Sequence, residues 1–92
     1  MNMRSCCDEL SAILKVIADN SRLKILKLLS GDTCCVCDIY KNLDLSQSLV
    51  SHHLSDLKKA NLVSYKKLPP KVLYSLTKKG KQITNLIFKI KP

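Results

Sequence analysis

Apolar residues recur at helical spacing through the first third of the chain. A first amphipathic helix is indicated by a stripe at i, i+3, i+4 and i+7, which consists of Leu10, Ile13, Leu14 and Ile17. Asp19-Asn20-Ser21 then offers N-cap residues for a second helix that runs to about Ser30, where Gly31 is a suitable stop. The apolar residues of this second helix cover more than one face, which predicts a central, largely buried helix; they are Leu23, Ile25, Leu26, Leu28 and Leu29.

The middle of the chain predicts two further helices separated by a short break. Asp32 or Thr33 caps the third helix, whose apolar positions are Val36, Ile39, Tyr40 and Leu43. After the break at 44–46, Ser46 caps a fourth helix over roughly Gln47 to Ala60. Its inward stripe is Val50, Leu54 and Leu57, and its outward face is polar but uncharged, with Gln47, Ser48, Ser51, His52 and Ser55.

The last third predicts a hairpin and a helix. Two short strands, 62–67 and 72–76, are joined by a turn at 68–71, and they stop before Pro69 and Pro70 because proline lacks the N–H that a ladder needs. Thr77 caps a last helix with the stripe Ile83, Leu86, Ile87 and Ile90. The order of four helices, a hairpin and a helix (α-α-α-α-β-β-α) predicts a mainly α fold with a small β-hairpin, the winged helix-turn-helix.

The size of the chain predicts one domain with a partner. Ninety-two residues form a single domain, 1–92, in which we expect residues 1–8 to be a flexible arm. The apolar stripes of the first and last helices exceed what one small core covers, which predicts a homodimer through these helices. No apolar run approaches the ~18 to 20 residues of a membrane span, and the N-terminus lacks the apolar stretch of a secretory signal. We therefore expect a cytoplasmic protein without a membrane partner.

Charge is distributed unevenly along the chain. Residues 1–56 carry six Lys/Arg against seven Asp/Glu, whereas residues 57–92 carry ten Lys and no acid, which together give the net charge of +9. Such asymmetry indicates a polyanionic partner, either nucleic acid or an anionic membrane surface, beside the plainer interpretation of a solubilising surface. Ten lysines without one compensating acid favour nucleic acid.

The fourth helix has the side chains that a DNA-reading helix needs. Glutamine, serine and histidine donate to and accept from base edges, and the lysines of the hairpin, Lys66, Lys67 and Lys71, suit phosphates. His52 points outward, which favours a DNA contact. His53 adjoins the inward Leu54, so a packed, hydrogen-bonded histidine is as good an interpretation there as a DNA contact.

Five cysteines form two groups, Cys6-Cys7 and the three at Cys34, Cys35 and Cys37. An odd number in a cytoplasmic chain argues against a disulfide framework. Thiolates bind soft ions, here As(III), Sb(III), Cd(II), Pb(II) or Zn(II). On an ideal helix Cys35 and Cys37 point nearly opposite ways, so they share an ion only at a loosened helix end or by distortion, whereas Cys34 and Cys37 lie on one face. Buried inert thiols and a thiol-oxidation switch are the alternatives.

Several segments resemble the arsenic-repressor (ArsR/SmtB) family of metal-sensing regulators. The resemblance covers about Leu10 to Leu76 and is carried by Val16–Leu26, Cys35–Ile39, Leu45–Leu54 and Lys58–Val63. It implies a homodimeric winged-helix repressor that binds double-stranded operator DNA and is released by a metal. The family's DNA contacts fall on Ser46, Gln47, Ser48, Ser51 and His52. The chain departs from the family at Ser48-Leu49, where Pro followed by a small residue is more usual.

The resemblance also implies which cysteines are ligands. The family motif matches Cys35 and Cys37, the third cysteine of the arsenic-sensing pattern is replaced by Tyr40, and Cys34 is an extra that could stand in for it. In the cadmium- and lead-sensing branch, N-terminal cysteines fold over this helix from the other subunit, a role open to Cys6 and Cys7. A second family site on the last helix uses His and carboxylates, and it is excluded because residues 77–92 contain none.

No sequence feature requires an enzyme. The chain has no nucleophile–base arrangement and no phosphate loop, so we expect neither catalysis nor a small organic substrate. The alternatives to a metal-released repressor are a thiol-redox regulator, a winged-helix repressor with no inducer site, and a metal carrier that does not bind DNA. The acid-free, lysine-rich end argues against the last of these.

Overall fold

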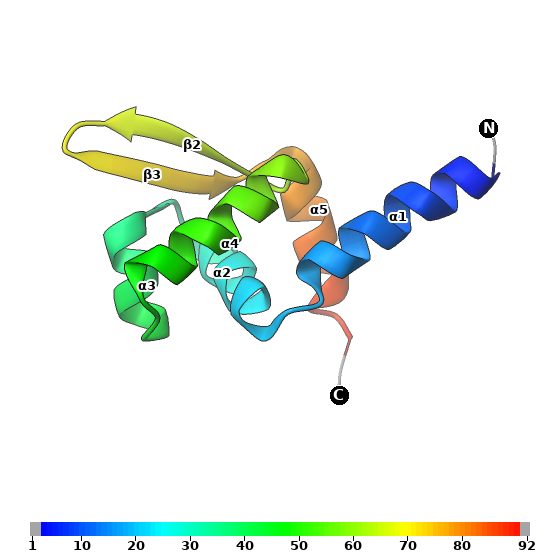
Figure 1. Ribbon diagram of the computed structural model, residues 1–92, viewed down its shortest axis with the longest axis horizontal. Coiled ribbons are helices and arrows are strands. Elements are labelled where there is room, and N and C mark those ends of the chain that lie inside the picture. The colour runs from blue at the N-terminus through cyan, green and yellow to red at the C-terminus, as the bar shows by residue number, and fades with distance from the viewer. Residues whose placement is uncertain (1–2, 91–92) are drawn as a thin grey trace.

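The computed structural model describes residues 3–90, in which five helices form a body and a small antiparallel sheet lies at one side of it (Figure 1). The elements are α1 (Met3–Ile17), α2 (Asn20–Gly31), β1 (Cys34–Cys35), α3 (Val36–Leu43), α4 (Gln47–Lys59), β2 (Val63–Leu68), β3 (Lys71–Leu76) and α5 (Lys78–Ile87). The winged helix-turn-helix fold is therefore confirmed, with one more strand than the sequence pattern predicts.

Side-chain caps start three of the helices where the sequence predicts them. Asp19 accepts a hydrogen bond from the Arg22 N–H at 3.0 Å at the start of α2. Ser46 Oγ accepts from the Leu49 N–H at 3.1 Å at the start of α4, and Thr77 Oγ1 caps α5 in the same way. Each cap satisfies a backbone donor that has no partner within its helix.

The start of α3 differs from the prediction of an Asp32 or Thr33 cap. The N-cap is Cys35, whose Sγ accepts from the Asp38 N–H at 3.3 Å. The helix begins this late because Cys34 and Cys35 form strand β1, which pairs antiparallel with β3 opposite Tyr74 and Leu73. A two-residue strand is too short to leave a periodic signature in the sequence.

The sheet has the strand order β1-β3-β2. In the hairpin, Val63 pairs with Leu76 and Leu68 pairs with Lys71, so Pro69 and Pro70 alone form the turn. The prediction that the strands end at the prolines is confirmed, although the turn is two residues shorter than expected. Figure 1 shows the hairpin projecting from the helical body as a wing.

The core is built around α2, as its apolar residues predict. Ile25 and Leu26 are fully buried, and they pack in one cluster with Ile39 of α3 and with Leu54 of α4. The predicted inward stripe of α4 is confirmed, because Val50, Leu54 and Leu57 are all completely buried. The remaining members of the cluster are Ile17, Leu29, Leu62, Val63 and Leu76.

The outer helices leave much of their apolar surface uncovered. Among residues 6–17 of α1, whose burial is described, only Ile17 is buried, whereas Leu10 and Leu14 are 55% and 49% exposed. The predicted stripe of the last helix is wrong at its end, because α5 stops at Ile87 and Ile90 lies beyond it. The residues that α5 buries are Gly80 and Thr84, and Leu86 is 64% exposed.

The expected arm, residues 1–8, falls in part within a helix. Residues 3–8 belong to the first turns of α1, which extends away from the other elements in Figure 1, and residues 1 and 2 lie outside the described part. None of the helices over residues 3–90 combines the length and apolarity needed to cross a membrane.

A close backbone contact fixes the root of the wing. An added Cβ at Gly80 of α5 would lie 2.0 Å from the carbonyl oxygen of Leu62, so only glycine fits there. Beside it, the Thr77 N–H donates to the Leu62 carbonyl at 3.0 Å, and Thr77 Oγ1 donates to the Asn61 carbonyl at 2.7 Å. These contacts join the end of α4 to the start of α5 and so set where the hairpin leaves the body.

Candidate DNA interface and thiol cluster

Helices α3 and α4 form the helix-turn-helix, and α4 presents a polar face. Asp44 ends α3 in a left-handed conformation (φ 53°), which turns the chain sharply toward α4. The outward residues predicted for α4 are all exposed, as is Ser46 at its cap; they are Gln47, Ser48, Ser51, His52 and Ser55. This face has donors and acceptors suited to base edges and is free of charge over its first two turns.

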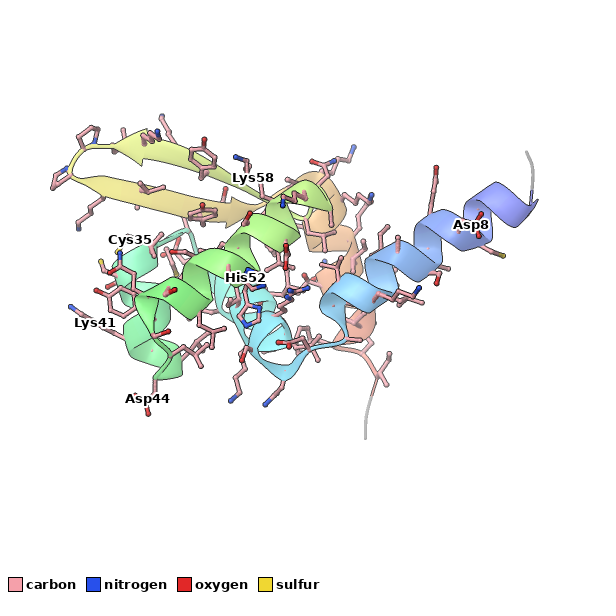
Figure 2. All side chains as sticks on the ribbon, in the orientation of Figure 1. Asp8, Cys35, Lys41, Asp44, His52 and Lys58 are labelled. Carbon is pink, nitrogen blue, oxygen red and sulfur yellow. The ribbon has the colours of Figure 1, made fainter. Side chains whose placement is uncertain are left out.

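An arginine from α2 holds α4 in place from the inside. Arg22 donates from Nε to Nδ1 of His53 at 2.9 Å and from Nη1 to the Val16 carbonyl at 3.1 Å, and its Nη2 pairs with the Asp56 carboxylate. His53 is only 6% exposed, so the interpretation of a packed, hydrogen-bonded histidine is confirmed. His52 is exposed on α4 (Figure 2), and its Nε2 lies 3.5 Å from Asp56 Oδ2.

The wing lysines and an aromatic contact complete the positive surface. Lys66, Lys67 and Lys71 are all exposed on the hairpin. Lys58 of α4 places its Nζ 4.3 Å from the centre of the Tyr65 ring on β2, a cation–π contact between the helix and the wing. This contact links the C-terminal end of α4 to the wing.

Cys35, Cys37 and Asp38 form a cluster at the start of α3. Their potential ligand atoms, two thiol sulfurs and a carboxylate oxygen, all lie within 4.8 Å of one another. The two sulfurs approach because Cys35 precedes the helix in an extended conformation (φ −76°, ψ 158°), so the ideal-helix argument against this pair does not apply. The geometry therefore supports the expectation that Cys35 and Cys37 can share an ion at a loosened helix end.

The remaining cysteines lie elsewhere. Cys34 is outside the cluster, and its Sγ donates to the Asp32 carbonyl at 3.6 Å. It lies in strand β1 and not on α3, so Cys34 and Cys37 do not share a helix face, and a role of Cys34 in binding an ion stays a prediction. Cys6 and Cys7 are exposed on α1, just before Asp8. Figure 2 shows Asp8 and Cys35 at opposite ends of the molecule, so within one chain this pair cannot reach the cluster.

Local hydrogen bonding and burial keep two of these thiols protonated. The hydrogen bond with the Cys37 thiol is the main cause that raises the pKa of Cys35, and burial is the main cause that raises the pKa of Cys34. A metal ion that binds Cys35 must therefore displace a proton.

One groove connects the thiol cluster with the reading face. It has a volume of about 400 Å³ and is lined by Cys35 and Cys37 at the start of α3, by Gln47 and Ser51 of α4, and by Lys71 and Val72 of the wing. Residues that the sequence assigns to metal and to DNA thus share one concave surface.

Two features of the site were not predicted from the sequence. Asp38 joins the cluster, and the only signal for it is that it directly follows the Cys-Val-Cys run. The contact of Arg22 with His53 and Asp56 joins residues 31 and 34 positions apart, which no local periodicity indicates.

The second helix of the helix-turn-helix has an exposed polar face, and a hairpin that bears lysines flanks it. This combination defines a winged-helix DNA-binding regulator. The model of the bacterial regulatory protein, arsR family, matches residues 19–65, from the cap of α2 to the middle of β2, and the chain belongs to this family. Members of this family and the solved structures of similar fold are transcriptional regulators rather than enzymes.

Two relatives illustrate the range of the family. The arsenical resistance operon repressor of Staphylococcus xylosus is 46% identical over 68 residues, which are 74% of this chain and 65% of the relative. The cadmium resistance transcriptional regulatory protein CadC of Listeria innocua is 40% identical over 78 residues, 84% of this chain and 64% of the relative. The chain thus spans slightly less than two thirds of these relatives.

Solved structures agree over almost the whole chain. Reduced HlyU from Vibrio cholerae superposes with a TM-score of 0.87 at 31% identity, covering 95% of this chain and 93% of that one. The homodimeric winged helix-turn-helix domain of Mb0332 from Mycobacterium bovis superposes with a TM-score of 0.85 at 22% identity, covering 97% and 85%. The latter supports the fold alone.

Proposed function

We propose that this protein is a homodimeric, cytoplasmic transcriptional repressor that leaves its operator when a thiophilic metal or metalloid ion binds Cys35 and Cys37. The observation that carries the proposal is the groove in which these two cysteines lie beside Gln47 and Ser51 of the reading helix. Relatives named for arsenical and cadmium resistance support the same kind of inducer.

The DNA interface divides into base-reading and phosphate-binding parts. Gln47, Ser48, Ser51 and His52 are the base-reading side chains of α4, which enters the major groove. Ser46 Oγ already accepts a hydrogen bond from the Leu49 N–H, so its own O–H remains free to donate to a phosphate. Lys66, Lys67 and Lys71 hold the adjacent phosphates and bind without regard to sequence.

The dimer forms through α1 and α5. Their exposed apolar side chains include Leu10, Leu14 and Leu86, with Ile90 just beyond α5 at 73% exposure. Burying such side chains against a second copy stabilises a dimer at roughly 25 cal/mol per Å² of apolar surface. A two-fold dimer then reads a palindrome with half-sites about one DNA turn apart, or a multiple of a turn.

The inducer site uses two thiolates and a carboxylate. Cys35, Cys37 and Asp38 offer a mixed set of sulfur and oxygen ligands, which suits Zn(II) and Cd(II) and, among softer ions, Pb(II). An all-thiolate site for As(III) or Sb(III) requires a further cysteine, and Cys6 or Cys7 of the second subunit is the candidate because neither reaches the cluster within its own chain.

A thiol-redox switch is the second candidate. The proximity of the Cys35 and Cys37 sulfurs favours it, because two neighbouring thiols are oxidised to a disulfide more readily than isolated ones. A repressor with no inducer site is the third, and in that case the cysteines are inert.

The proposal is tested with DNA from immediately upstream of the gene that encodes this chain. We expect the reduced protein to sediment as a dimer at micromolar concentration and to bind this DNA well above a scrambled duplex in a gel shift. Adding Cd(II) or As(III) under reducing conditions should release the DNA. Equal binding to both duplexes, or a monomer at this concentration, would contradict the proposal.

A further inference from the structure

We infer that an apolar groove along α2 binds a small organic anion, a molecule with an apolar body and one carboxylate. The inference goes beyond the proposed function, because neither DNA nor a metal ion takes part in it. The molecule is bound as a ligand and is not converted, so the expectation that the chain has no organic substrate is unaffected.

The groove follows a face of α2 that the core leaves uncovered. Its α2 residues recur at the i, i+3, i+4, i+7 and i+8 spacing of a single helix face; they are Asn20, Leu23, Lys24, Lys27 and Leu28. The core uses another face of this helix, where Ile25, Leu26 and Leu29 are buried. The apolar residues that cover more than one face of α2 therefore include a second set, Leu23 and Leu28, which stay half-buried.

Two other elements complete the walls of this groove, which we call the α2 groove. Leu43, the last residue of α3, and Phe88, which directly follows α5, line it beside the α2 residues. The α2 groove has a volume of about 410 Å³, within the range of small-molecule sites, roughly 300–1,000 Å³. Because Asp44 follows Leu43 and turns the chain toward α4, a ligand in this groove contacts the segment that leads into the recognition helix.

The charged groups of the α2 groove favour an anion. Lys24 and Lys27 are exposed on α2, and the described lining contains no acidic side chain. Lys27 Nζ lies 5.0 Å from the centre of the Phe88 ring, a cation–π contact that holds the ammonium group beside the apolar wall. An ammonium group has three N–H donors, so it can still donate to a carboxylate while one side faces the ring. A carboxylate on an apolar body therefore matches both the lysines and the leucines of the groove.

A second copy of the chain fits the α2 groove less well. The apolar side chain that α5 offers to the proposed dimer is Leu86. Phe88 continues the helical hydrogen bonding of α5, since its N–H donates to the Thr84 carbonyl at 3.1 Å. Residues two apart on a helix point nearly opposite ways, at ~100° per residue, so Leu86 and Phe88 lie on different sides of the end of α5. A dimer through Leu86 does not require the α2 groove to be covered.

The first test locates the bound anion. The reduced, metal-free protein is titrated with sodium decanoate below its micelle concentration, and the leucine methyl signals are followed by NMR. We expect saturable shifts at Leu23, Leu28 and Leu43 and little change in the wing. The absence of a saturable shift would overturn the inference. The largest shifts at Leu10 and Leu86 would also overturn it, because they place the decanoate on the apolar surfaces of α1 and α5.

The second test measures the contribution of charge. Calorimetric titrations compare decanoate with decanol and decylammonium, which have the same apolar chain but a neutral or a positive group. Wild type should bind decanoate roughly tenfold more tightly than either, the effect of one hydrogen bond between charged groups. The double variant Lys24→Gln/Lys27→Gln should lose this preference. The matched control Lys41→Gln/Lys78→Gln, which changes two exposed lysines outside the groove, should keep it.

The outcomes of this comparison are independent of the proposed function, because the titrations contain no DNA and no Cd(II). All four lysines are exposed, so the variants should fold like wild type, which the NMR spectrum of each free variant checks. Equal affinity of wild type for the three compounds would overturn the inference, as would a loss of preference in the control as large as in Lys24→Gln/Lys27→Gln.

Discussion

Arg22 of α2 donates from its Nε to Nδ1 of His53 at 2.9 Å, and this hydrogen bond ties the recognition helix to the helix behind it. The same guanidinium pairs with Asp56 one turn further along α4 and donates to the Val16 carbonyl of α1. Three helices therefore meet at one side chain, and the exposed face of α4 is oriented by a contact on its buried side.

Replacing Arg22 by lysine should destabilise the fold, because an ammonium group cannot reproduce a planar guanidinium that bonds three partners. We expect Arg22→Lys to lower the free energy of unfolding by about 2–3 kcal/mol, measured by denaturant unfolding. Lys24→Ala, an exposed position on the same helix, should stay within about 0.5 kcal/mol of the wild type. An unchanged unfolding midpoint in Arg22→Lys would show that the contact contributes little.

The cap of α2 makes stability depend on pH. The hydrogen bond from the Arg22 N–H is the main cause that lowers the pKa of Asp19 below its ordinary value of 3.8. A lowered pKa means that the ionised carboxylate stabilises the fold above pH 3.8, and that this contribution disappears as the pH falls through the lowered pKa.

Asp19→Ala should therefore lose about 1 kcal/mol of unfolding free energy at neutral pH. The difference from the wild type should narrow as the solution is acidified below pH 3.8, as followed by denaturant unfolding at several pH values. Asp19→Asn retains a side-chain acceptor for the cap and should lose less. A difference between wild type and Asp19→Ala that is constant down to low pH would contradict the assignment.

The two glycines should respond oppositely to alanine. At Gly80 the new Cβ would lie 2.0 Å from the Leu62 carbonyl oxygen, so Gly80→Ala must shift α5 or the wing root and should lower the thermal unfolding midpoint markedly. At Gly31 nothing lies within 4 Å and the φ angle is negative, so Gly31→Ala should stabilise the fold by about 0.4–1 kcal/mol. Equal midpoints in the two variants would contradict the close contact.

The division of the DNA interface predicts two kinds of defect. Gln47→Ala should reduce the preference for operator over scrambled DNA, at roughly 1–3 kcal/mol for a good base contact. Lys66→Ala should weaken binding to both duplexes about equally and flatten the dependence of affinity on salt. Anisotropy titrations at several salt concentrations distinguish these effects, and the reverse pattern would mean that the proposed orientation is wrong.

The spacing of apolar residues was sufficient to predict the helices that are long enough to repeat it. The buried stripe of α4 follows from the spacing of Val50, Leu54 and Leu57, and its polar face follows with it. Strand β1 could not be predicted, since two residues have no period. Because Cys34 and Cys35 lie in this strand and not in a helix, the arrangement of the thiols differs from the one expected on an ideal helix. Only the pairing of Cys34 and Cys35 with β3 makes Cys35 an extended N-cap whose sulfur turns toward Cys37.

Contacts between residues far apart in the sequence could not be predicted from the spacing of apolar residues either. The partners of Arg22 lie on α4 and at the end of α1, and they become neighbours only when the helices pack. The end of α5 was predicted too far along the chain because Ile90 continues the apolar spacing although the helix stops at Ile87. Apolar spacing identifies a face but not the residue at which hydrogen bonding ceases.

Release of the operator by an ion that Cys35 and Cys37 bind is tested by operator affinity with and without Cd(II), in a buffer that keeps thiols reduced. We predict that wild type, Cys34→Ser and Cys37→Ser bind the operator equally well without metal. Cd(II) should then weaken binding by wild type and Cys34→Ser but not by Cys37→Ser. Wild-type affinity that is unchanged by Cd(II) or As(III), together with loss of binding on mild oxidation, would contradict release by an ion and identify a redox switch instead.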